Sequence, residues 1–68
     1  MQTEVQEIFD HYEVKEVKSK KEAYDLIENH FGTLKCKSTD YELEDGELWE
    51  VYPPSGVSDI PLHILIKG

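Results

Sequence analysis

The 68-residue chain carries a formal net charge of −8 and is 38% hydrophobic and 32% charged. This length accommodates a single domain over residues 1–68, and the composition is too apolar for a disordered tail. A chain this short buries only about 60% of its unfolded surface, so a deep internal active site would remove most of its core. These figures disfavour an enzyme, and no cofactor is expected.

The balance of charges excludes several classes of partner. All seven basic residues are lysines, against fifteen acidic residues, and there is no arginine. Direct nucleic-acid binding needs a basic surface and favours arginine, and an anionic membrane surface would repel this chain. We expect instead a protein partner with a basic surface. The alternative is that the charge only keeps a small protein in solution.

A single cysteine, Cys36, cannot form an internal disulfide, which favours the reducing cytoplasm. The three histidines have no paired ligand spacing, so no metal site is expected. The sequence also lacks a glycine-rich phosphate loop, and Cys36 alternates with apolar Leu34 as a core residue would. A small enzyme or metal-binding protein is therefore the third of three functional alternatives.

The N-terminal segment has the spacing of an amphipathic helix. Its apolar residues follow the i, i+3, i+4, i+7 pattern that places them on one face, and they are Val5, Ile8, Phe9 and Tyr12. The next segment, residues 13–18, has no clear period. We expect a short strand or an extended connection there.

A second helix is predicted over residues 19–31. Ser19 is a suitable N-cap, and Glu22 has the spacing of a capping box. Gly32 follows the last apolar residue, where a helix commonly ends in a left-handed conformation. The apolar face of this helix comprises Ala23, Leu26, Ile27 and Phe31.

Beyond this helix the apolar residues alternate as they do in strands. Leu34 and Cys36 are out of phase with Tyr41 and Leu43. A bulge shifts the phase of a strand by one residue, so we expect a bulge or bend at residues 38–40.

Asp45 and Gly46 form a strong hairpin signal, because a type I′ turn needs positive φ at both positions. This turn would start the return strand, which runs to Tyr52 and ends at the prolines that follow. The predicted cross-strand pairs are Leu43 with Leu48, Glu42 with Trp49, and Tyr41 with Glu50.

A last strand is predicted from Ile60, where apolar residues alternate strictly with others. The expected fold is α+β, with two helices on a three- or four-stranded, mostly antiparallel sheet in the order α-(β)-α-β-β-β. The core facing the helices would comprise Ile8, Phe9, Leu26, Ile27, Phe31, Leu34, Leu43, Ile60, Leu62, Ile64 and Ile66. At a sheet edge, the last strand would expose Leu65 and favour a homodimer.

The predicted hairpin concentrates acidic and aromatic residues. Alternate side chains on a strand are about 6.6 Å apart, which is close to the spacing of phosphates along one DNA strand, roughly 6–7 Å. The candidate binding residues are Asp40, Tyr41, Glu42, Glu44, Asp45, Glu47, Trp49, Glu50 and Tyr52. A solvated hairpin whose charges prevent aggregation is the alternative.

The favoured function is a non-enzymatic protein-binding module that acts as a regulator or inhibitor through this hairpin. The second alternative is a mimic of DNA or RNA that occupies the basic groove of a nucleic-acid enzyme. Trp49 is either an exposed anchor of the interface or the largest residue of the core. The lysines that flank the start of the second helix are either ordinary surface charge or contacts to the acidic hairpin of another copy.

Overall fold

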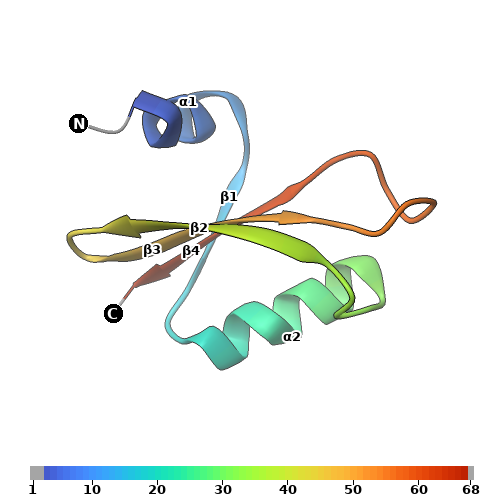
Figure 1. Cartoon of the computed structure of the whole chain (residues 1–68). Helices are drawn as coiled ribbons and strands as arrows, with labels where there is room; N and C mark the ends of the chain where they lie inside the picture. The colour runs from blue at the N-terminus through green and yellow to red at the C-terminus, as the bar shows by residue number, and fades with distance from the viewer. Residues whose placement is uncertain (1–2, 68) are drawn as a thin grey trace.

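Within residues 3–67, which the computed structural model describes, two helices cover opposite faces of one four-stranded sheet (Figure 1). The elements are α1 (Thr3–His11), β1 (Val14–Val17), α2 (Lys20–Phe31), β2 (Lys37–Leu43), β3 (Gly46–Tyr52) and β4 (Leu62–Lys67). The strands lie in the order β1-β4-β3-β2. The predicted α+β class is confirmed, and the ambiguous segment after α1 is a strand.

The sheet is mixed, whereas the sequence predicted a mostly antiparallel one. β3 is antiparallel to both of its neighbours, but β1 runs parallel to β4, with Val14 opposite His63 and Val17 opposite Ile66. The two strands of this parallel pair lie at opposite ends of the chain. Their pairing therefore has no local turn signal that a sequence pattern could reveal.

The predicted boundaries of α2 are confirmed by its caps. The Ser19 hydroxyl accepts a hydrogen bond of 3.3 Å from the backbone N–H of Glu22. At the other end, Gly32 adopts a left-handed φ of 75°, and its N–H donates to the Glu28 carbonyl at 2.7 Å. Both caps satisfy backbone groups that a helix end leaves unpaired. Ala23, Ile27 and Phe31 are buried on the inner face.

The apolar core is divided between the two faces of the sheet, which corrects the prediction that both helices cover one face. The α2 face holds the larger cluster, comprising Ala23, Ile27, Phe31, Trp49, Val51, Leu62, Ile64 and Ile66. The α1 face holds a smaller one of Val5, Ile8 and Leu48. Strand β3 requires this arrangement because Leu48 and Trp49 are adjacent, point to opposite faces and are both buried.

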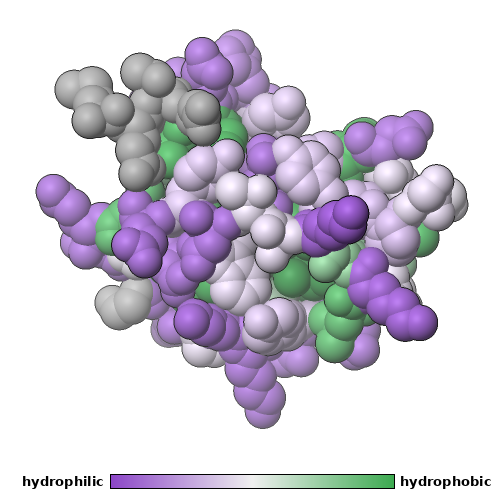
Figure 2. All heavy atoms as spheres, in the orientation of Figure 1, coloured by the Kyte–Doolittle hydropathy of each residue, from purple (hydrophilic) through white to green (hydrophobic). Residues whose placement is uncertain are grey.

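Three predicted core residues, Phe9, Leu34 and Ile60, are instead exposed. Leu34 and Ile60 belong to connections outside the strands, and the 70% exposed Ile60 precedes β4, which begins at Leu62. Hydrophilic side chains dominate the face drawn in Figure 2, and the apolar residues visible there form small separate groups. No helix in the described part of the chain has the length and apolar character needed to cross a membrane.

The last strand is internal, not at an edge. β4 lies between β1 and β3, so its backbone is paired on both sides and cannot add a strand from another copy. Leu65 is half-buried on the α1 face. The prediction that β4 is an edge strand able to pair with a second copy is therefore wrong. Self-association through another surface stays a prediction.

The β2–β3 hairpin is present, but its turn lies one residue earlier than predicted, so its cross-strand register differs by two residues. Leu43 pairs with Gly46, so Glu44 and Asp45 form the turn. No described residue other than glycine has positive φ, which excludes the predicted type I′ turn at Asp45. The structure instead requires glycine at position 46 because a Cβ there would lie 1.9 Å from the Ile66 carbonyl oxygen of β4.

β2 is continuous over Lys37–Leu43, so the predicted bulge at 38–40 is absent from it. Cys36 precedes the strand and packs against the α2-face cluster, whereas Tyr41 and Leu43 contact the α1-face cluster. The change of phase seen in the sequence therefore marks the entry to β2, not an irregularity inside it.

Candidate functional site

The nine predicted binding residues all lie on the β2–β3 hairpin, but they do not share one surface. Direct cross-strand partners occupy the same face of a sheet, and this divides the set. The α2 face carries Asp40, Glu42, Glu47 and Trp49, the α1 face carries Tyr41, Glu50 and Tyr52, and the turn carries Glu44 and Asp45. The hairpin therefore presents two distinct groups of polar side chains.

The first group lies on the outer strand β2, on the turn that follows it and at the start of β3. β2 is an edge strand, and no other described strand pairs with its outer side. We name as the acidic edge the five carboxylates of the α2 face and the turn, which are Asp40, Glu42, Glu44, Asp45 and Glu47. Their negative charge is only partly balanced within the molecule, by the Lys20 ammonium, whose Nζ lies 3.9 Å from a carboxylate oxygen of Glu47.

Crowding on the acidic edge changes the pKa of Asp40. Desolvation and the hydrogen bond and negative charge of Glu47 together raise the pKa of Asp40 above its ordinary 3.8, and the charge of Glu42 adds to this. Lys20 opposes the change but does not cancel it. Ionised Asp40 is therefore electrostatically disfavoured here, and a cation brought to this edge would relieve the repulsion.

Trp49 belongs to the core. Its side chain is 7% exposed in the α2-face cluster, and its ring meets Tyr24 edge-on with the centroids 5.3 Å apart. The indole Nε1–H has no hydrogen-bond acceptor among the described residues. Of the two predicted roles, the structure supports the core role, so exposed aromatic contacts at the hairpin come from Tyr52, which is 44% exposed.

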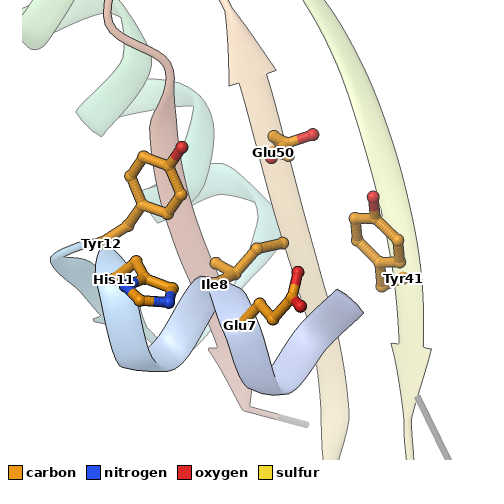
Figure 3. Close-up of a pocket in the computed structure, with 6 residues that line it drawn as sticks. All are labelled: Glu7, Ile8, His11, Tyr12, Tyr41 and Glu50. Atoms are coloured by element: carbon orange, nitrogen blue, oxygen red, sulfur yellow. The ribbon is translucent and has the colours of Figure 1, made fainter. Parts of the chain in front are cut away.

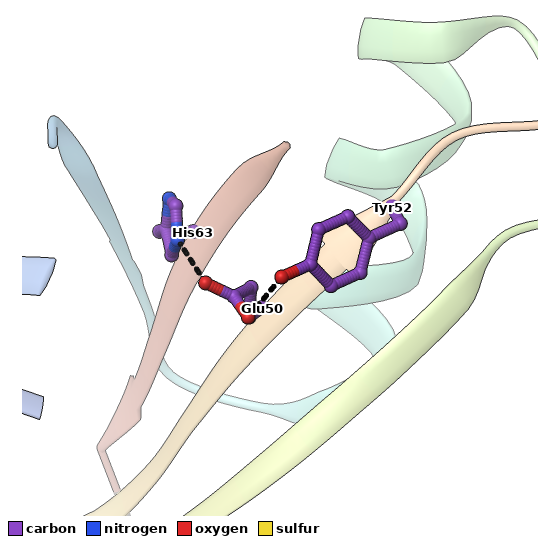
Figure 4. Close-up of polar contacts among 3 residues, drawn as sticks. All are labelled: Glu50, Tyr52 and His63. Carbon is purple, nitrogen blue, oxygen red and sulfur yellow. Dashed lines mark hydrogen bonds and ion pairs between the residues drawn. The ribbon is translucent and has the colours of Figure 1, made fainter. Parts of the chain in front are cut away.

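The second group centres on Glu50, which links a buried histidine to a tyrosine (Figure 4). His63 is 1% exposed, and its Nε2 lies 3.0 Å from Oε2 of Glu50. The Tyr52 hydroxyl donates to Oε1 of the same carboxylate. Burial disfavours the charge of Glu50, but the two hydrogen bonds outweigh it and lower the pKa of Glu50. An ionised carboxylate only accepts, so Nε2 of His63 carries the hydrogen.

A hollow of about 330 Å³ opens beside this carboxylate, between α1 and the hairpin (Figure 3). We name it the α1 hollow, and its lining residues are Glu7, Ile8, His11, Tyr12, Tyr41 and Glu50. The Tyr12 ring also stacks on His63, with the centroids 4.6 Å apart. The α1 hollow therefore combines two carboxylates, an imidazole and two phenol rings.

Sequence reasoning missed four residues of this second group: Glu7, His11, Tyr12 and His63. Glu7 and His11 are four residues apart on α1, a spacing that places two polar side chains on one helix face, and this signal was present in the sequence. His63 gave no such signal, because its partner Glu50 is thirteen residues away and meets it only through the pairing of β3 with β4.

The described residues contain no group of three or more histidine, cysteine, aspartate or glutamate side chains that could hold a metal ion. Cys36 is half-buried, and its Sγ lies 3.7 Å from the Thr33 carbonyl oxygen. Comparison with models of known families, with curated proteins and with solved structures finds no match for this chain. Functional inference therefore rests on the acidic edge and the α1 hollow.

Proposed function

We propose that the protein is a non-enzymatic protein-binding module that regulates or inhibits its partner by adding a basic, extended segment of that partner to β2. The observation that carries this proposal is that two carboxylates of the acidic edge, Asp40 and Glu42, lie on a seven-residue outer strand. An exposed strand edge binds an extended peptide through main-chain hydrogen bonds, and its side chains set the specificity.

The charge of β2 determines which strand can pair with it. Asp40 and Glu42 are exposed on the same face of the strand. If β2 paired with β2 of a second copy, these two residues would lie close to acidic residues of that copy. Like charges across a strand pair are unfavourable, whereas opposite charges stabilise it. The acidic edge therefore disfavours self-pairing and favours a partner segment rich in lysine or arginine.

The electrostatics of Asp40 support the same choice. Its raised pKa reflects repulsion from Glu47 and Glu42 in addition to desolvation. A basic side chain from a partner would reduce this repulsion and keep Asp40 ionised. We also keep the cytoplasm as the proposed location, because a lone, half-buried Cys36 is compatible with a reducing compartment.

The test compares two variants that each lose three negative charges. The edge variant carries Asp40→Asn, Glu42→Gln and Glu44→Gln, and the control variant carries Asp25→Asn, Glu28→Gln and Asp59→Asn, all at exposed positions. Each protein is immobilised and used to capture partners from a lysate of the source cell. We expect a specific partner to be retained by the parent and the control but lost by the edge variant.

Equal loss from both variants would contradict the proposal, because it would mean that only net charge matters. Retention by both would place the interface elsewhere. Binding to the captured partner at increasing salt then separates the mimic of DNA or RNA from a strand-pairing module. A mimic that replaces many phosphate contacts loses roughly a thousandfold or more in affinity between 50 and 200 mM salt, whereas strand pairing is much less sensitive.

A further inference from the structure

The α1 hollow is a separate feature from the acidic edge. It lies on the opposite face of the hairpin, between α1 and the strands β2 and β3 (Figure 3). A volume of about 330 Å³ accommodates a small organic group or a long side chain. An occupant would meet helix residues on one side and Tyr41 and Glu50 on the other.

The charge of the lining residues determines the sign of the charge that an occupant of the hollow can carry. Glu7 and Glu50 both line the hollow, and the described residues around it include no lysine. The hydrogen bonds from Tyr52 and His63 fix the carboxylate of Glu50 in position, so it cannot swing away toward solvent. An anion would be repelled by this pair of carboxylates, whereas a cation would be attracted.

The aromatic lining selects the chemical type of the cation. Tyr12 and Tyr41 line the hollow together with the apolar side chain of Ile8. Tyr12 stacks on His63 but is still 48% exposed, so part of its ring is accessible to an occupant. Phenol faces attract ammonium groups through their quadrupole and also contact attached methylenes. An alkylammonium fits this combination better than a bare metal ion, which needs several converging ligands.

We propose that the α1 hollow binds an organic ammonium group, held by the carboxylates of Glu7 and Glu50 and by the rings of Tyr12 and Tyr41. The ammonium belongs either to a free alkylamine or to a lysine side chain presented by a partner. This proposal goes beyond the proposed function, because the hollow includes none of the residues of the acidic edge.

The test is a titration of ¹⁵N-labelled full-length protein at pH 8, followed by backbone amide chemical shifts. The probe is n-butylammonium chloride, with 1-butanol as the uncharged control and sodium chloride at matched ionic strength as the salt control. We expect saturable shifts that centre on α1, Tyr12, Tyr41 and Glu50, with a Kd in the millimolar range. Nα-acetyl-lysine-methylamide is the second probe. Tighter binding of this capped lysine would assign the site to a lysine side chain, and weaker binding to a free amine.

Two variants on the same helix make the test specific. Glu7→Gln removes an exposed carboxylate of the hollow, and Asp10→Asn removes an exposed carboxylate of α1 that does not line it. We expect Glu7→Gln to weaken butylammonium binding about fivefold, as for one exposed ion pair, and Asp10→Asn to leave it unchanged. Identical shifts with 1-butanol, shifts spread over all acidic residues, or undiminished binding by Glu7→Gln would each overturn the proposal.

Discussion

His63 and Glu50 lie directly opposite each other on β4 and β3, and Nε2 of the buried imidazole is 3.0 Å from the carboxylate. Glu50→Ala should therefore leave the N–H of His63 buried without an acceptor, which costs about 1–3 kcal/mol of unfolding free energy. Urea unfolding followed by circular dichroism measures this loss. Glu47→Ala is the matched control on the same strand. It should cost less than about 1 kcal/mol, because the long ion pair of Glu47 with Lys20 is weak and its charge also repels Asp40. Equal losses of unfolding free energy in the two variants would show that the contact with His63 does not stabilise the fold more than an ordinary surface carboxylate does.

The same contact makes the stability of the fold depend on pH in the acidic range. The pKa of Glu50 is lowered from 4.5 in the folded protein, so its ionised form stabilises the fold. This contribution is complete above pH 4.5 and is lost as the pH falls through the lowered pKa. Unfolding free energies measured from pH 7 to pH 2 should therefore converge for the parent and Glu50→Ala. A difference that persists undiminished at pH 2 would contradict the assignment.

Tyr52 should ionise at a higher pH than an ordinary tyrosine. Its hydroxyl donates to Glu50, which, with burial, raises the pKa of Tyr52 from 10.0 to about 12. The bond stabilises the fold fully below pH 10 and is lost as the pH rises through 12. Absorbance at 295 nm should show one late-titrating phenol, absent from Tyr52→Phe and shifted back toward pH 10 in Glu50→Gln. An unchanged curve in Tyr52→Phe would assign the late phenol to another tyrosine.

Gly46 and Asp45 distinguish the observed turn from the predicted one. In Gly46→Ala the new Cβ meets the Ile66 carbonyl at 1.9 Å, and because this is backbone, we expect a loss of about 1–3 kcal/mol, typical of overpacking. Asp45→Ala should change stability by less than about 0.5 kcal/mol, since this exposed residue has ordinary negative φ. Thermal unfolding of both variants measures the contrast. A large loss of stability in Asp45→Ala, with none in Gly46→Ala, would instead support the type I′ turn that the sequence predicted.

Trp49 can be tested as a core residue by two substitutions of different size. Trp49→Ala should cost about 3–5 kcal/mol, which is comparable to the whole stability of a small domain. Trp49→Phe keeps a ring in the α2-face cluster and removes an indole N–H that has no acceptor among the described residues, so we expect a much smaller loss. Chemical unfolding measures both. Similar stability of Trp49→Ala and the parent would mean that the ring is not part of the core.

Local signals predicted the elements well because they act over a few residues. The Ser19 cap and the left-handed Gly32 bound α2 as expected, and the alternating apolar residues of β4 face one helix. The register of the hairpin was predicted wrongly because glycine is required at position 46 by the close approach of the β4 backbone, and not by the turn. Likewise, the burial of both Leu48 and Trp49 follows from helices on two faces, an arrangement that no single strand pattern encodes.

The candidate site was predicted only in part for the same reason. The acids of the acidic edge are close in sequence, so their proximity in the hairpin was foreseeable. Their cross-strand partners depended on the register, because Glu42 pairs with Glu47 and not with the predicted Trp49. The pairing of Glu50 with His63, and the place of Glu7 beside them, depend on contacts between distant segments.

The unequal cores give the two halves of the molecule different resistance to opening. Among its described side chains, α1 buries only Val5 and Ile8, whereas α2 packs on the larger cluster. Regions with few buried contacts open at lower free energy than the whole domain. Amide hydrogens of α1 should therefore exchange through a partial opening that leaves α2 and the central strands protected. In that open form, Leu48 and the His63–Glu50 pair become accessible to water while the rest of the chain stays folded.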